Sequence, residues 1–166
     1  MTRLPWLERY TGQTIEELLA LEGVFRTDSL IVAIVQGLFE KTGRDGPESL
    51  SEEEENVLAV EALQAEVMNG GFWQFFFNRS VVHSPSIVEA LKPFGCPVAA
   101  AITQEAIDAL GLSEVTVGTV SDRIDEVDPQ RDKLHNELTF RFYKESEFLE
   151  EKVFSFIKSR RLKFNL

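Results

Sequence analysis

The sequence predicts an all-α protein, a compact bundle of six to eight short helices around a Phe-rich core. Apolar residues recur at helical spacing along most of the chain, and two capping boxes, Thr14 with Glu17 and Ser51 with Glu54, mark helix starts. The apolar residues are unusually aromatic, with 13 Phe and 2 Trp against 2 Met. Only residues 115–120 have a strand-like composition, and an isolated strand is not stable.

Three helices are expected in the first part of the chain. The capping box at Thr14 starts the first, and Gly23 ends it. Asp28 is expected to cap the second and Gly43 to end it, before a loop that is rich in Gly and Pro. The capping box at Ser51 starts the third, which should stop near residues 69–71 and bury Val57, Val60, Leu63 and Val67.

Shorter helices should follow. Ser84 is expected to cap one helix, with Pro85 at its first position, and Pro97 starts another that Gly111 stops. Residues 115–120 are expected to be an extended link into a helix at about residues 121–127.

After Asp128-Pro129 the chain is predicted to be helical to about Ser159, with a break near residues 144–146. Its apolar residues recur with helical spacing and should be buried. They are Leu134, Leu138, Phe142, Phe148, Leu149, Val153, Phe156 and Ile157.

Length and composition predict one domain, residues 1–166, in the cytoplasm. The chain has no apolar stretch long enough to span a bilayer and no apolar signal-peptide core. Its single cysteine, Cys96, is expected to be a small buried side chain. The net charge of −11 would repel nucleic acid and anionic membranes, so neither is an expected partner.

The segment from Asn69 to Asn78 holds five aromatic residues in six positions. On a helix, Phe72, Phe75 and Phe76 share one face, which favours a structural core. The alternative is a ligand pocket lined by Phe and Trp, with amide side chains as polar anchors. Exposed Trp73 or Phe77 would favour a homodimer. The residues of this signature or pocket are Asn69, Gly70, Gly71, Phe72, Trp73, Gln74, Phe75, Phe76 and Asn78.

This segment also carries a family resemblance. The run from Ala62 to Asn78 resembles the signature of a bacterial family that is catalogued as a domain of unknown function (number 4375) and named after an acidic DNA-mimic protein. The likeness extends over about residues 56–157, and the segments from Phe142 to Leu149 and Phe156-Ile157 resemble the family's closing helices. Membership implies an all-helical fold and, as a further expectation, DNA mimicry. It implies no catalytic residues.

Acidic residues could bind a basic partner if the fold gathers them on one side. The basic tail, residues 158–166, holds four cations and no acid, so the rest has 13 basic and 28 acidic residues, a net charge of −15. A duplex about 40 Å long would carry roughly 23 charges, so mimicry requires clustering. Asp122, Asp125 and Glu126 are expected on one side of a helix. The candidate partner-binding acids are Glu52, Glu53, Glu54, Glu55, Asp122, Asp125, Glu126 and Asp128. Each set is also explained by a solvated helix start or turn.

No arrangement of residues indicates a reaction. Asp132 and His135 could share a metal, but two ligands are too few, and no metal or cofactor is expected. Ser84 lacks the surroundings of a nucleophile. The basic tail is expected either to end a helix favourably or to clamp the domain's own acids.

The sequence therefore predicts an acidic interaction protein without enzymatic activity, binding a basic protein such as a DNA-binding protein. The alternatives are a small-molecule or enzymatic domain with a pocket at the aromatic segment, and an immunity-like partner protein. An open pocket beside Asn69, Trp73, Gln74 or Asn78 would favour the first alternative.

Overall fold

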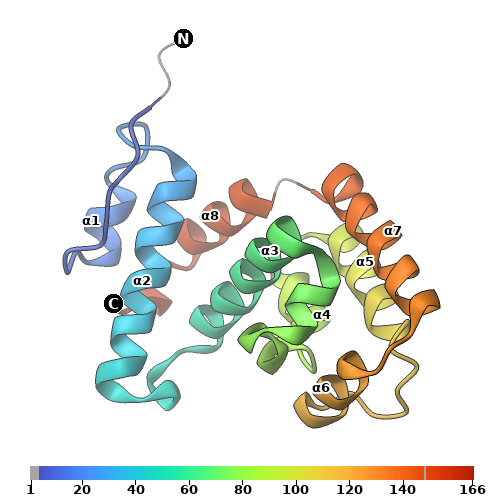
Figure 1. Cartoon of the computed structure of the whole chain (residues 1–166). Helices are drawn as coiled ribbons and strands as arrows, with labels where there is room; N and C mark the ends of the chain where they lie inside the picture. The colour runs from blue at the N-terminus through green and yellow to red at the C-terminus, as the bar shows by residue number, and fades with distance from the viewer. Residues whose placement is uncertain (1–3, 148) are drawn as a thin grey trace. The chain divides into compact units, whose positions relative to one another are not determined.

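The computed structural model of the chain describes residues 4–147 and 149–166. These residues form eight α-helices joined by loops and short 3-10 turns, with no strand among them (Figure 1). The all-α class is confirmed. Contacts along the chain define two compact units, Met1–Leu58 with Glu150–Leu166, and Ala59–Leu149. The single domain expected over residues 1–166 stays a prediction.

The first unit holds α1 (Ile15–Leu19), α2 (Thr27–Asp45), the start of α3 (Glu52–Phe77) and nearly all of α8 (Leu149–Ser159). Both predicted capping boxes are present. The Thr14 hydroxyl accepts the Glu17 N–H at 3.2 Å, and the Ser51 hydroxyl accepts the Glu54 N–H at 3.2 Å. Helix α2 packs its apolar face against the rest of this unit, and it buries Leu30, Ile31, Ile34 and Leu38.

Two expected boundaries of α2 are wrong. The helix begins at Thr27, so Asp28 lies in its first turn, where it pairs with Arg26 and accepts the N–H of Ser29. Gly43 does not end the helix, because it stays within the helical backbone. The end comes at Gly46, whose φ of 89° breaks the helical pattern.

A buried ion pair lies between α2 and the start of α3. The Lys41 ammonium reaches the Glu54 carboxylate at 2.7 and 3.0 Å, and both side chains are almost fully shielded from water. The same carboxylate accepts the backbone N–H groups of Ser51 and Asn165, each at 2.8 Å. A buried carboxylate needs such partners, so the role of Glu54 is structural.

The basic tail is held by acids of its own unit. Lys158 pairs with Glu22 at 2.6 Å, and Arg160 lies 3.6 Å from Glu53. The carbonyl of Lys163 accepts the Ser51 hydroxyl at 3.0 Å. Of the two expected roles for the tail, these contacts support the clamp on the chain's own acids.

The second unit holds the rest of α3, α4 (Ile87–Leu91), α5 (Pro97–Asp108), α6 (Val117–Asp125) and α7 (Pro129–Glu145). Here α5 packs against both α4 and α7 (Figure 1). Pro97 and Pro129 each occupy a first helical position, where a missing N–H costs nothing. The break expected near residues 144–146 is confirmed, because α7 ends at Glu145. Helix α5 ends at Asp108, three residues before Gly111, which has a φ of 65°.

Three local expectations are wrong in this unit. Ser84 does not start α4, because a 3-10 turn (Arg79–His83) precedes it and Ser86 takes the cap position. Residues 117–120 are helical, because Thr116 and Thr119 form a capping box that starts α6. Leu134 is exposed on α7, while Leu138 and Phe142 are buried as expected. Phe148 lies outside the described residues.

We predict that Glu54→Ala lowers the free energy of unfolding by about 3–5 kcal/mol, because it leaves the Lys41 ammonium buried and unpaired. The neighbouring Glu55→Ala, at an exposed position of the same helical turn, should change it by less than about 0.5 kcal/mol. Urea unfolding of both variants measures the difference. Equal, small losses would contradict a buried structural role for Glu54.

Candidate functional site: the aromatic segment and the acidic corner

The α3 helix, which was expected to stop near residues 69–71, bends sharply at Gly71 and continues as the aromatic segment. Gly71 has φ 81° and ψ −178°, a backbone conformation that is open essentially only to glycine. A Cβ atom there would also lie 2.8 Å from the Thr139 hydroxyl of α7. Both the conformation and the close approach therefore require glycine at this position.

Helix α7 supplies partners to backbone groups on either side of this bend. The Thr139 hydroxyl accepts the N–H of Phe72 at 3.1 Å, and it donates to the carbonyl of His135 at 2.8 Å. The Tyr143 hydroxyl donates to the carbonyl of Val67 at 2.7 Å. These bonds fix the direction in which the aromatic segment leaves the bend.

Phe72, Phe75 and Phe76 are completely buried, as their shared helical face predicted. The Phe72 ring meets Phe142 of α7 edge to face at 5.6 Å, and the Phe76 ring lies 5.4 Å from the imidazole of His135. Each buried Phe side chain contributes roughly 1.5–3 kcal/mol. These three rings belong to the core of the second unit.

Gln74 and Asn78, the half-buried amide side chains that follow the bend, bind a carboxylate. Their side-chain amides both donate to the same oxygen of Glu66, at 2.6 and 2.8 Å. Gly70 makes room for this arrangement, because a Cβ atom there would collide with the Gln74 side chain. Asn69 is exposed at the bend.

Trp73 and Phe77 remain at the surface, outside the core that buries the other three aromatic residues of the segment. Trp73 is 42% exposed and Phe77 is 51% exposed. Their rings stack on one another, with centroids 4.4 Å apart and planes 16° from parallel. The aromatic segment therefore has a buried half and an exposed half. The expected homodimer stays a prediction.

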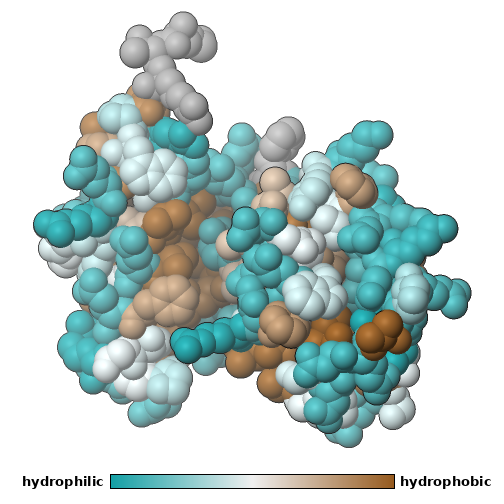
Figure 2. Space-filling model, in the orientation of Figure 1, coloured by the Kyte–Doolittle hydropathy of each residue, from teal (hydrophilic) through white to brown (hydrophobic). Residues whose placement is uncertain are grey.

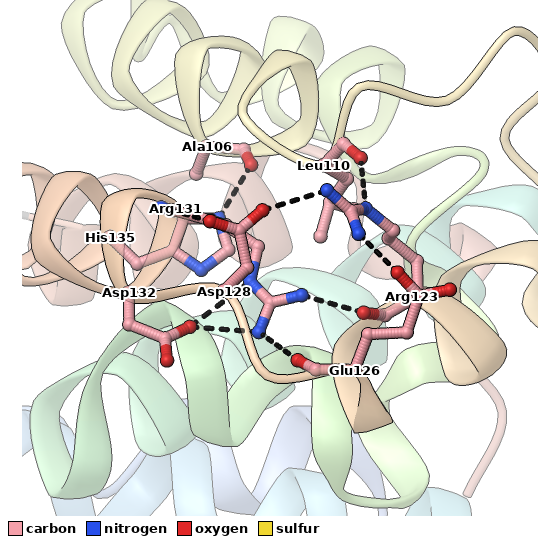
Figure 3. A network of polar contacts seen from close by, with 8 residues as sticks. All are labelled: Ala106, Leu110, Arg123, Glu126, Asp128, Arg131, Asp132 and His135. Carbon is pink, nitrogen blue, oxygen red and sulfur yellow. Dashed lines mark hydrogen bonds and ion pairs between the residues drawn. The ribbon is translucent and has the colours of Figure 1, made fainter.

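The second candidate region is the acidic corner, which we define as residues 122–132, at the end of α6 and the start of α7 (Figure 3). It holds five carboxylates and two guanidiniums. Arg131 is buried and donates to the carbonyls of Arg123 and Glu126 at 2.6 and 2.8 Å and to Asp132 at 2.8 and 3.0 Å. The charge of Arg131 is therefore compensated by groups within the acidic corner.

Arg123 also binds neighbouring groups of the second unit. It donates to the carbonyl of Leu110 at 2.8 Å, and it pairs with Glu126 and with Asp128. Asp128 caps α7 by accepting the Arg131 N–H at 3.0 Å, and this bond holds the pKa of its carboxyl below the ordinary value. Glu126 lies just past the end of α6, so it does not continue the helical side expected for it.

Asp122 and Asp125 are the outward-facing acids of the corner. Both are exposed on α6, three residues apart and so on the same side of the helix. Neither forms an ion pair within residues 4–147 and 149–166. Their charge is available to a partner, whereas Glu126 and Asp128 are engaged by arginine.

The four consecutive glutamates differ in the same way. Glu54 is buried against Lys41, and Glu53 lies near Arg160, while Glu52 and Glu55 are exposed. Glu52–Glu55 belong to the first unit and the acidic corner to the second.

Sequence reasoning missed Glu66, Arg123 and Arg131 as organising residues. A signal existed only for Arg123, which precedes two acids at helical and turn spacing.

His135 is buried beside Phe76, and its Nε2 lies 2.9 Å from the carbonyl of Ala106. Burial lowers the pKa of His135 below its ordinary value, and burial also lowers the pKa of His83. Within the described residues no group of three His, Cys, Asp or Glu side chains could hold a metal ion. The imidazole of His135 is thus part of the aromatic core.

We predict that acidification destabilises the protein through these histidines. Below about pH 6.5 the unfolded chain binds protons that the folded imidazoles exclude, so the free energy of unfolding falls until the pH passes the lowered pKa values. Denaturant titrations between pH 7 and pH 5 measure this loss. The double variant His83→Asn/His135→Gln should lose less stability over that interval, and an unchanged loss would contradict the assignment.

We also predict that Gly71→Ala costs at least about 1–3 kcal/mol of stability, because the backbone conformation is strained for alanine and the Thr139 hydroxyl is in the way. Gly43→Ala is the matched control: a Cβ there meets nothing within 4 Å, and alanine should stabilise α2 by about 0.5–1 kcal/mol. Thermal unfolding separates the two. A harmless Gly71→Ala would refute the bend as a fixed constraint.

Comparison with known proteins supplies one match. No curated protein and no solved structure matches the chain. A family model described as DMP19-like protein matches residues 48–160, which is 113 of the 166 residues. The matched range contains the aromatic segment, the bend at Gly71, the acidic corner and all of the second unit. The chain therefore belongs to the family of DMP19-like proteins.

Proposed function

We propose that this chain is a protein-interaction protein without catalytic activity, whose acidic surface binds a basic DNA-binding protein in place of DNA. The observation that carries the proposal is the division of charge in the acidic corner. Its two arginines bind carbonyls and carboxylates of the fold, whereas Asp122 and Asp125 are exposed to water.

The charge of the second unit supports this proposal. Residues 59–149 contain 14 Asp and Glu against seven Lys and Arg, a net charge of −7 out of −11 for the whole chain. One of these cations, Arg131, is buried, so the surface is more negative than the count suggests. On the face in view, hydrophilic side chains predominate around α7 (Figure 2). Such a field attracts a cationic partner and speeds its association.

Family membership supports the same class of partner. The chain belongs to the family of DMP19-like proteins, and its signature at residues 62–78 resembles a family that is named after an acidic DNA mimic. A basic surface that normally binds phosphates accepts carboxylates by the same charge-assisted hydrogen bonds. None of the helices within residues 4–147 and 149–166 combines the length and hydropathy that a membrane crossing needs.

The test is capture of bacterial lysate proteins on the immobilised chain, with elution by duplex DNA. We expect basic DNA-binding proteins that both duplex DNA and high salt release. Asp122→Asn/Asp125→Asn should weaken their capture severalfold, since each rim charge acts through long-range attraction and a short contact. The control Glu89→Gln/Glu137→Gln removes the same charge from exposed positions of the same unit and should have less effect.

Partners that resist both salt and DNA would contradict the proposal. Equal loss of capture in the two double variants would show that only net charge matters and that the acidic corner is not the site. Thermal unfolding of each variant checks that the corner stays folded.

A further inference from the structure

We infer that Trp73 and Phe77, together with the Glu66 carboxylate that the adjacent residues Gln74 and Asn78 hold, form a binding site for one arginine side chain of a basic protein partner. We call Trp73, Phe77 and Glu66 the aromatic–carboxylate site. The inference rests on the proposed function, because it assumes a basic partner, and it adds which cation that partner uses.

The exposed ring pair is the first element of this site. The fold does not bury Trp73 and Phe77, although it buries the three other aromatic residues of the same segment. Their nearly parallel stacking holds the two rings in one orientation relative to each other at the surface. Exposed, preoriented aromatic faces are the surfaces on which guanidinium groups stack.

A fixed carboxylate is the second element. The amides of Gln74 and Asn78 hold one oxygen of Glu66 at 2.6 and 2.8 Å, and each follows one of the two rings directly in sequence. Within residues 4–147 and 149–166, no ion pair joins Glu66 to a lysine or an arginine. Two amide donors orient the carboxylate but leave its negative charge uncompensated.

Charge and shape together select arginine as the occupant. The unit's net charge of −7 favours a cationic ligand over an anionic or neutral one. A planar guanidinium can stack on a ring and at the same time donate to a carboxylate, whereas an ammonium has no flat face and holds its water more strongly. The site is therefore expected to prefer arginine to lysine at equal charge.

The experiment measures this preference in a Trp6→Phe background, in which Trp73 is the only tryptophan. A peptide of alternating glycine and arginine and the matching glycine–lysine peptide, of equal length and charge, are titrated while Trp73 emission is recorded. The arginine peptide should bind about five- to tenfold more tightly and change the emission, because stacking and the Glu66 pair add about 1 kcal/mol or slightly more.

Glu66→Gln keeps an acceptor for the two amides but removes the charge, and it should abolish most of the preference. Phe77→Ala should do the same, measured by the same emission, and Trp73→Ala is followed by calorimetry. Phe140→Ala, which removes another exposed aromatic side chain from the same unit, should leave the preference unchanged.

The outcomes separate this inference from the function on which it rests. If both peptides bind equally and weaken alike with salt, the acidic surface binds basic ligands and the arginine site is wrong. If neither peptide binds at low salt, both proposals fail. An arginine preference that survives Glu66→Gln and Phe77→Ala would place the preference elsewhere and overturn the site.

Discussion

The bend at Gly71 is the constraint on which the second unit depends. It lets one helix become two, so that Phe72, Phe75 and Phe76 turn into the core while Trp73 and Phe77 face water. Thr139 and Tyr143 of α7 fix the bend by binding Phe72 N–H and Val67 C=O. The same change of direction brings Gln74 and Asn78 to Glu66, eight and twelve residues earlier in the chain. The buried rings, the exposed rings and the contacts of Glu66 therefore all depend on the backbone conformation at Gly71.

Acidic residues serve three separate purposes in this chain. Glu54 is a buried partner of Lys41, Asp128 is a helix cap, and Asp122 and Asp125 are solvated. The excess of negative charge arises only in part from residues that the fold requires. Arg123 and Arg131 bind groups of the fold itself and so do not neutralise the solvated acids. Under the proposed function, these solvated acids are the groups that a basic partner binds.

Local sequence patterns predicted much of the fold. The capping boxes at Thr14 and Ser51, the bend near Gly71 and the buried face of the aromatic segment each depend on residues at most four positions apart. The site was predicted less well, because its partners come from distant positions. Glu54 looked like a solvated acid, yet Lys41 and the backbone of Asn165 reach it from 13 and 111 residues away. No helical spacing links Glu66 to Asn78, since the bend intervenes.

The proposed function requires that this chain and DNA compete for one surface of a basic protein. The direct measurement is the fluorescence anisotropy of a labelled duplex bound to a captured partner, titrated with the intact chain. Competition predicts that the anisotropy falls to the value of the free duplex, and that more of the Asp122→Asn/Asp125→Asn variant is needed to reach that value. A rise in anisotropy, from a complex that contains DNA and this chain together, would contradict mimicry.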